Sequence, residues 1–364
     1  MTYKLIIGIV AVCALLLIVT LWKRENSIPE LFRTPAILAP ELLTAHAARC
    51  ALSTSTPERG IVGMSYHTIA GEVRQQEYDA LAALGVKHVR IDVGWKYIAH
   101  EDGTYDWGGL DALIGELTKR GIAVSDATVV HVPDTLRTWE DAASELEKFM
   151  RITVLRYKPD GVYANAHPEF SGIRYWEIFN EPNLSGVGFL PPNVLPSDFV
   201  DGYALLLMSA NRAIHEVDPE AFVIAAGLSP DGMPPQEFFT RIISLAPTCF
   251  DIAAYHPYGL PEQFHTTAEK YRSLMTAQGI IGRPLWFNEY GTTEDNERAE
   301  LIVKAFAHSN AADAFFWFTL RDLAPIGENY GVLDYQYTQK PEYQTLKDSY
   351  MNAQKTTTSS SIQP

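Results

Sequence analysis

Two glutamates occupy the same kind of position in this chain, although 108 residues separate them. Glu181 lies in "RYWEIFNEPN" (174–183) and Glu289 in "PLWFNEYG" (284–291), and in both stretches a run of large hydrophobic residues leads into Asn-Glu. Such runs predict buried strands. Two carboxylates that face each other across a cleft can cleave a glycosidic bond: one protonates the leaving oxygen, and the other attacks the anomeric carbon or activates water. The residue types indicate the pair but leave open which glutamate takes which role.

Eight short segments rich in β-branched and aromatic residues are the predicted strands of the chain. Most are continuously apolar, as expected for parallel strands that helices cover. Eight strand–helix units over about 290 residues predict a (β/α)8 TIM barrel across residues 58–350. A doubly wound open sheet is the alternative, but the sequence lacks the GxGxxG phosphate loop typical of it. The predicted strands are 61–66, 86–93, 122–130, 173–180, 221–227, 250–256, 284–289 and 313–319.

Helical periodicity fills the gaps between these segments. Thr138 and Asp141, three residues apart, resemble a capping box at the start of one predicted helix. Gly121 follows another helical pattern as its stop signal. The apolar face of that pattern consists of Leu110, Leu113, Ile114 and Leu117.

A barrel would bring the two glutamates together. Active sites of (β/α)8 barrels lie at the C-terminal ends of the strands. Glu181 ends the fourth predicted strand and Glu289 the seventh, so both side chains should face one cleft. A single carboxylate at a strand end is explained as a helix cap, but two of them, each preceded by Asn, favour a catalytic pair.

Five motifs give the chain a resemblance to a known family. They are "WEIFNEPN", "LWFNEYG", "VRIDVGW", "AAYHPYG" and "GVLDYQYTQKPEY". With them, residues 58–350 resemble the retaining glycoside hydrolases of clan A and are most similar to family 39. The resemblance implies that Glu181 is the general acid/base and Glu289 the nucleophile. It also implies carboxyl groups about 5–5.5 Å apart, against about 6.5–9.5 Å for inverting enzymes.

Two polar residues are candidates for support of this pair. Arg90 lies inside the hydrophobic strand "HVRIDV", and a buried guanidinium needs a partner. Placed beside Glu289, it would hold that carboxylate ionised; an ion pair with Asp92 or Glu177 is the structural alternative. Asn180 precedes the acid, and the resemblance implies that it contacts the sugar hydroxyl next to the reacting carbon.

The remaining candidates for substrate binding are aromatic residues and a histidine. His256 and Tyr258 are two positions apart at the end of the sixth predicted strand, so both can point the same way. We expect Tyr258 to bond the nucleophile and His256 to contact the sugar. Trp317, at the end of the eighth strand, would lie under the reacting sugar as in similar enzymes, with a core tryptophan as the alternative. Tyr290 and Trp95 also end strands and are candidate subsite walls.

Composition excludes several other classes of function. The formal net charge of −15 argues against nucleic acid as a partner, because phosphate binding needs a basic surface. The sequence has no GxxxxGK[ST] loop, no HExxH and no CxxC, so we predict no nucleotide, metal or other cofactor. Cys50 and Cys249 would both lie near the N-terminal face of the barrel, where a disulfide is one open possibility.

The N-terminus carries a separate signal. Residues 5–22 contain no charge and, as a helix, would span about 27 Å, close to the thickness of a bilayer core. We predict an uncleaved transmembrane anchor, with a cleaved signal peptide as the alternative, then a spacer over 23–57 and a disordered tail over 351–364. Lys23 and Arg24 after the helix favour a cytoplasmic barrel, but long domains cross membranes largely regardless of such charges.

These expectations combine into one leading hypothesis. It is a membrane-anchored, exported glycosidase that acts on a β-linked poly- or oligosaccharide at the periplasm or cell surface. A catalytically silent glycan-binding barrel of the cell envelope is the alternative from a different class. A family 5-like endoglucanase is the alternative among enzymes. The sugar, the linkage and the choice between internal and terminal cleavage are left open.

Overall fold

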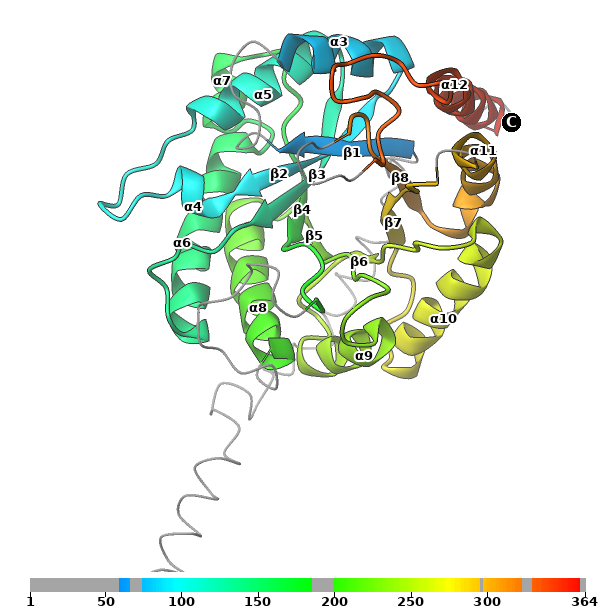
Figure 1. Cartoon of the computed structure of the whole chain (residues 1–364). Coiled ribbons are helices and arrows are strands. Elements are labelled where there is room, and N and C mark those ends of the chain that lie inside the picture. The colour runs from blue at the N-terminus through cyan, green and yellow to red at the C-terminus, as the bar shows by residue number, and fades with distance from the viewer. Residues whose placement is uncertain (1–58, 66–73, 185–198, 295–296, 323–328, 361–364) are drawn as a thin grey trace, which may run out of the picture. The chain divides into compact units, whose positions relative to one another are not determined.

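The computed structural model of this chain describes residues 59–65, 74–184, 199–294, 297–322 and 329–360. Within them, eight strands form one parallel sheet in the order β5-β4-β3-β2-β1-β8-β7-β6. Bridges between Ile224 and Ile252 and between Leu228 and Tyr255 join the two ends, so the sheet closes into a barrel (Figure 1). The strands are β1 Arg59–Ser65, β2 His88–Gly94, β3 Ala123–Val130, β4 Tyr175–Ile178, β5 Phe222–Ala225, β6 Ala253–Ala254, β7 Leu285–Tyr290 and β8 Ala314–Phe318.

Helices surround this barrel and follow the strands in the order that the sequence predicts (Figure 1). All eight predicted strands are present, so the (β/α)8 prediction is confirmed. The helices are α3 Arg74–Leu84, α4 Trp95–Ile98, α5 Gly108–Lys119, α6 Trp139–Tyr157, α7 Val162–Ala166, α8 Phe199–Val217, α9 Pro235–Leu245, α10 Phe264–Ala277, α11 Arg298–His308 and α12 Tyr343–Ser360, with short 3-10 turns at Pro261–Gln263 and Ser309–Ala311.

Local signals determine where the helices begin and which face they bury. The Thr138 hydroxyl accepts a hydrogen bond from the Asp141 backbone N–H at 3.1 Å, which caps α6 as predicted. Gly121, which comes shortly after α5, has φ +65°, a left-handed conformation that glycine adopts without steric cost. The buried face of α5 is the predicted one, formed by Leu110, Leu113, Ile114 and Leu117.

The barrel interior has an apolar floor and a polar layer above it. On β7, Trp286 belongs to the floor, and Asn288, two residues further toward the strand's C-terminal end, belongs to the polar layer. The floor consists of Val62, Ile224, Ile252, Ala254, Trp286, Ala314 and Phe316. The polar layer consists of Arg90, Asp126, Thr128, Glu177 and Asn288, all of them buried.

A β-bulge in β7 aims two consecutive side chains into the barrel. Phe287 pairs with Phe315 and Tyr290 pairs with Trp317, so three steps on β7 match two on β8. An extra residue interrupts the strict alternation of side chains. The carboxylate of Glu289 therefore enters the interior directly after the Asn288 amide.

The two ends of the chain either differ from the sequence prediction or lie outside the described residues. Residues 351–360 belong to α12, whereas the sequence analysis expects a disordered tail over 351–364. Buried Leu346 and Tyr350 hold the first part of α12 against the barrel, and each further turn only extends a helix that has already formed. Residues 361–364, the predicted anchor 5–22, the spacer 23–57 and Cys50 lie outside the described residues. In the ranges described, no helix has both the length and the apolarity needed to cross a bilayer.

Candidate active site

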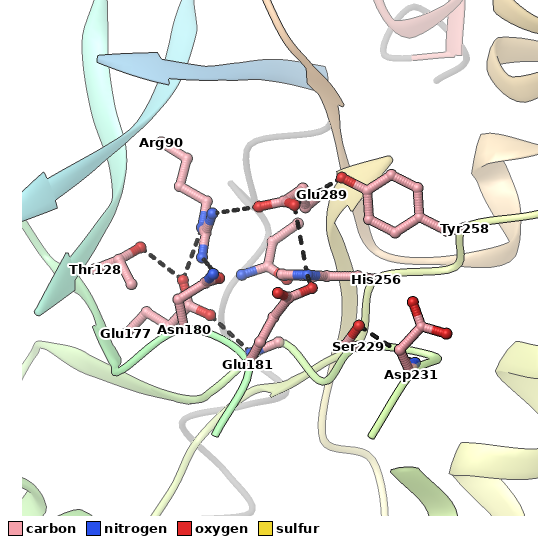
Figure 2. A network of polar contacts seen from close by, with 12 residues as sticks. Arg90, Thr128, Glu177, Asn180, Glu181, Ser229, Asp231, His256, Tyr258 and Glu289 are labelled. Atoms are coloured by element: carbon pink, nitrogen blue, oxygen red, sulfur yellow. Dashed lines mark hydrogen bonds and ion pairs between the residues drawn. The ribbon is translucent and has the colours of Figure 1, made fainter. Parts of the chain in front are cut away.

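The two glutamates meet at the C-terminal end of the barrel. One carboxylate oxygen of Glu181, one of Glu289 and a ring nitrogen of His256 lie within 4.8 Å of one another. Figure 2 shows both carboxylates next to His256, with Arg90 and Tyr258 on the two sides of Glu289. The structure thus brings the two side chains together at this end of the barrel.

An unusual backbone places the Glu181 side chain. Phe179 and Glu181 both have positive φ angles, +63° and +46°, which place them in the left-handed region. Each costs on the order of 1 kcal/mol for a residue with a Cβ, and such strain is typical of functional sites. The Glu181 N–H donates to the Gly227 carbonyl at 3.0 Å, which ties the turn after β4 to the end of β5.

Asn183 reinforces this turn, and the sequence analysis missed it. Its amide donates to the carbonyls of Ser229, Asp231 and Met233 at 2.9, 2.8 and 3.0 Å. Its carbonyl oxygen accepts from the Ser229 N–H at 3.0 Å. A buried Asn that bonds three loop carbonyls fixes the loop after β5 against Glu181. The signal in the sequence was the second Asn of "NEPN", two residues after the acid, because an Asn that is buried there needs hydrogen-bond partners.

Arg90 joins the nucleophile candidate to the floor of the site. The Arg90 side chain is 3% exposed, and its Nη1 donates to Glu289 at 3.0 Å while its Nε donates to Glu177 at 2.8 Å. Its Nη2 donates to the Asn180 carbonyl oxygen at 2.6 Å. Burial lowers the pKa of Arg90, but Glu177, Asp126 and Glu289 outweigh burial and raise it. The sequence analysis gave Glu289 and Glu177 as alternative partners of Arg90, and the structure shows contacts with both.

Glu177 orients Arg90 from below. It is fully buried and accepts a hydrogen bond from the Thr128 hydroxyl at 2.6 Å (Figure 2). It accepts a second one from the Gly227 N–H at 2.7 Å. Burial raises the pKa of Glu177, but the charge and hydrogen bond of Arg90 outweigh burial and lower it. This carboxylate is ionised and fully bonded, as a structural residue should be.

Glu289 and Glu181 have different partners. Glu289 accepts from Arg90 and from the Tyr258 hydroxyl, which donates at 2.7 Å. Burial raises the pKa of Glu289 by more than His256 and Arg90 lower it. Glu181 instead lies 2.8 Å from Nδ1 of His256. Burial raises the pKa of Glu181, but contact with His256 outweighs burial and lowers it.

His256 shares a proton with Glu181. Burial lowers the pKa of His256, yet the negative charges of Glu289 and Glu181 outweigh burial and raise it. The lowered pKa of Glu181 and the raised pKa of His256 both favour an ion pair across this 2.8 Å contact, in which Nδ1 holds the proton. Groups that interact this strongly titrate together, so the proton belongs to the pair.

The structure places three predicted substrate contacts among core residues, outside the cluster around Glu181 and Glu289. Trp317 is 0% exposed and packs at 5.8 Å against the ring of Tyr290, which is 1% exposed. The Tyr290 hydroxyl donates to the Gly259 carbonyl at 3.0 Å. Trp95, 1% exposed, stacks on Phe149 at 5.7 Å. Trp317 follows the inward-facing Phe316 on β8, so it points outward toward the helices.

Phe318 stands where Trp317 was expected. It ends β8, is partly exposed and packs against the apolar floor of the barrel. Its ring lies 5.3 Å from that of Tyr330, which in turn lies 6.0 Å from the Tyr258 ring. Alternation along "FFWF" gives Phe316 and Phe318 the same direction, and this signal was available in the sequence.

The spacing of Glu181, His256 and Glu289 would also suit a metal ion. The surroundings do not fit one, because the Arg90 guanidinium lies 3.0 Å from Glu289 and repels a cation. Nδ1 of His256 is already engaged with Glu181. The chemistry of the donor set therefore favours a metal-independent site.

Comparison with known proteins supports the fold. No protein-family model and no curated protein matches the chain. Among solved structures it is similar to a glucosidase from Croceicoccus marinus (TM-score 0.62, 15% identity, 82% of this chain and 67% of that chain). It is similar to a β-xylosidase from Caulobacter crescentus CB15 (TM-score 0.60, 19% identity, 82% of this chain and 68% of that chain). It is also similar to a GH5_18 structure from Streptomyces cattleya in complex with Manβ1-4GlcNAc (TM-score 0.61, 15% identity, 81% of this chain and 80% of that chain). At these identities the likeness establishes a fold shared with glycosidases, and the resemblance to clan A holds at that level.

Proposed function

We propose that the chain is a retaining glycoside hydrolase that cleaves β-glycosidic bonds of a poly- or oligosaccharide. The observation that carries the proposal is the spacing of the two carboxylates, whose nearest oxygens lie within 4.8 Å. This spacing suits the pair of a retaining enzyme, about 5–5.5 Å, and is too short for the water that an inverting enzyme places between them, at about 6.5–9.5 Å.

The different partners of the two glutamates support the assignment of their roles. Glu289 is the nucleophile, because Arg90 and Tyr258 fix its oxygens and stabilise its ionised form. Glu181 is the acid/base, because the proton that it shares with His256 can be transferred to the leaving oxygen. Glu289 attacks the anomeric carbon as the glycosidic bond to the leaving oxygen breaks. Water then hydrolyses the glycosyl-enzyme, with Glu181 as the base.

Two further residues complete the substrate site in this proposal. Arg90 binds the carbonyl oxygen of Asn180, so the amide nitrogen of Asn180 is the group that meets a sugar hydroxyl. Phe318 supplies an apolar face for the reacting sugar in place of Trp317.

The test is the stereochemistry of the product together with the site of labelling. Proton NMR of the fresh hydrolysis product should show the β-anomer first, and a 2-deoxy-2-fluoroglycoside should label Glu289. Glu289→Gln and Glu181→Gln should each lose at least about 10³-fold in kcat. An α-anomer as first product would refute retention. Full turnover by both variants would favour the alternative of a silent glycan-binding barrel.

Substrate preference separates the two enzyme alternatives. The similar structures include a β-xylosidase and a GH5_18 protein that binds Manβ1-4GlcNAc. A family 39-like activity predicts release of terminal sugars from aryl β-glycosides and short oligosaccharides. A family 5-like endoglucanase would instead lower the viscosity of a long β-glucan before it releases free sugar.

We further propose that residues 5–22 anchor the protein and that the barrel is exported. The support is the uncharged stretch of 18 residues and the extracytoplasmic location of most polysaccharides. Protease added to spheroplasts should degrade the barrel, and a cytoplasmic marker should survive. A barrel that is protected until the cells are lysed would place it in the cytoplasm.

A further inference from the structure

Gly227, just after β5, lies against three parts of the candidate site. Its N–H donates to Glu177 at 2.7 Å, and its carbonyl accepts from the Glu181 N–H at 3.0 Å. A Cβ at this position would stand 2.2 Å from Nε2 of His256 and 2.6 Å from Oδ1 of Asn288. The position therefore requires glycine, and the His256 nitrogen and the Asn288 oxygen share the space beside its Cα.

These two atoms are buried and complementary. His256 and Asn288 are both 0% exposed, and neither Nε2 nor Oδ1 has a hydrogen-bond partner among the residues that the structure describes. Leaving a buried donor and a buried acceptor unpaired is costly, and nearly all such groups in proteins are paired. An amide oxygen can only accept, so the matching state of the histidine carries a proton on Nε2.

We propose that Asn288 is a positioning residue for the acid: its Oδ1 accepts Nε2–H of His256, directly or through one buried water, so that the contact between Nδ1 and Glu181 can be made only by a second, transferable proton. This proposal rests on the proposed function of Glu181. It adds a residue that touches neither substrate nor acid and acts through the tautomer of His256.

Asp126 fixes the orientation of the Asn288 amide. The amide nitrogen of Asn288 donates to Oδ2 of Asp126 at 3.0 Å, and Nε of Arg90 lies 3.5 Å from the same oxygen. Burial and the charge of Glu177 raise the pKa of Asp126. When Asp126 is protonated, the proton lies on Oδ1, because the Asn288 amide and Nε of Arg90 already direct donors at Oδ2. The Asn288 oxygen is thus turned toward His256 in either state of Asp126.

The tautomer decides the state of the acid. With Nε2 protonated, the 2.8 Å contact between Nδ1 and Glu181 needs one more proton, which lies on the carboxyl beside a neutral ring or on Nδ1 of a charged ring. The pair then holds the proton that the leaving oxygen needs. With the opposite tautomer, Nδ1–H would donate to an ionised Glu181, and the acid would be unloaded. The other ionisable groups around His256 are Glu289, Tyr258, Arg90 and Glu177.

A direct test reads the two ring nitrogens of His256 without any activity assay. In the full-length protein labelled with ¹⁵N-histidine, the spectrum of His256→Gln identifies the His256 signals. Between about pH 5 and about pH 9, we expect Nε2 to stay protonated and Nδ1 to change. A ring whose Nε2 titrates while Nδ1 stays protonated, or a ring that keeps both protons throughout, would overturn the proposal.

Variants of Asn288 test the effect on the acid. Asn288→Leu removes the acceptor, so the alkaline limb of kcat/KM should move down by about one pH unit. Asn288→Asp keeps an acceptor at this position and adds a negative charge that favours the Nε2 proton, so its limb should not move down. Asn211→Leu, which removes an amide on the outer helix α8, is the matched control. A loss in Asn288→Leu that is equal at every pH would mean a purely structural role and would refute the proposal.

The two tests separate this inference from the function on which it rests. A wild-type protein that cleaves no glycan would refute the proposed function, while the nitrogen signals of His256 would still report its tautomer. An active enzyme with the opposite tautomer would refute only the role of Asn288.

Discussion

Arg90 on β2 and Glu289 on β7 are 199 positions apart in the sequence, and their side chains meet at 3.0 Å inside the barrel. The same guanidinium binds Glu177 at 2.8 Å and lies 3.5 Å from Asp126. One guanidinium thus lies beside three buried carboxyl groups and fixes the direction of the nucleophile. Activity and stability should depend on it together.

Replacement of Arg90 by Met should therefore be costly in two ways. Removal of one partner from a buried ion pair leaves uncompensated charge, so the free energy of unfolding should fall by about 3–5 kcal/mol. The kcat should fall by about 10²–10³-fold, because Glu289 loses a fixed positive charge. Urea unfolding and steady-state kinetics measure the two effects. Arg241→Met, which breaks an exposed pair with Asp201, should cost at most about 1 kcal/mol and no activity. A stable, active Arg90→Met would contradict this account of the site.

Tyr258→Phe should shift the pH profile without unfolding the protein. The hydroxyl donates to Glu289 at 2.7 Å and favours its ionised form, so its loss raises the pKa of Glu289. The acidic limb of kcat/KM reports ionisation of the nucleophile and should move up by about one pH unit. Tyr290→Phe is the matched control, because its hydroxyl bonds the Gly259 carbonyl outside the site. An acidic limb that moves in both variants, or in neither, would argue against this role for Tyr258.

Phe318 and Trp317 should separate substrate binding from stability. Phe318→Ala removes the apolar face proposed for the reacting sugar, so KM should rise by about tenfold. Trp317→Leu opens a cavity in a fully buried cluster and should cost about 2–4 kcal/mol with unchanged KM. Thermal unfolding and initial rates on an aryl glycoside give both values. The reverse pattern would restore the tryptophan as the sugar platform.

Gly227→Ala should lose activity because the added Cβ would stand 2.2 Å from Nε2 of His256. The ring must move, and the contact with Glu181 moves with it, so kcat should fall by at least about 10²-fold. Gly115→Ala, inside α5, adds a Cβ with its nearest neighbour at 3.1 Å, where alanine also favours the helix. That control should be neutral or slightly stabilising. Full activity of Gly227→Ala would show that the space beside this residue is not critical.

The sequence was sufficient for the features that depend on local patterns. Alternating strand and helix periods gave the eight strands, strand ends gave Glu181, Glu289, Asn180, His256 and Tyr258, and the charge inside an apolar strand gave Arg90. The structure brings these residues into one cluster. These predictions needed the order of elements, which short-range periodicity encodes.

The misplaced aromatic residues show what local patterns lack. In "AFFWF" every position is apolar, so the pattern does not reveal which side chains face inward, and Trp317 was given the direction that Phe318 has. Pairing with neighbouring strands sets that direction. Asn288 and Asp126 are 162 positions apart, and nothing along the chain announces their contact.

The bulge in β7 has a consequence for what the site would lose without it. Deletion of Phe287 would restore regular alternation, with Glu289 still facing the interior and Asn288 turned toward the surrounding helices. The barrel would keep its hydrogen-bonded ladder and its apolar floor. The extra residue therefore serves to place a second polar side chain inside the barrel, directly beside the nucleophile.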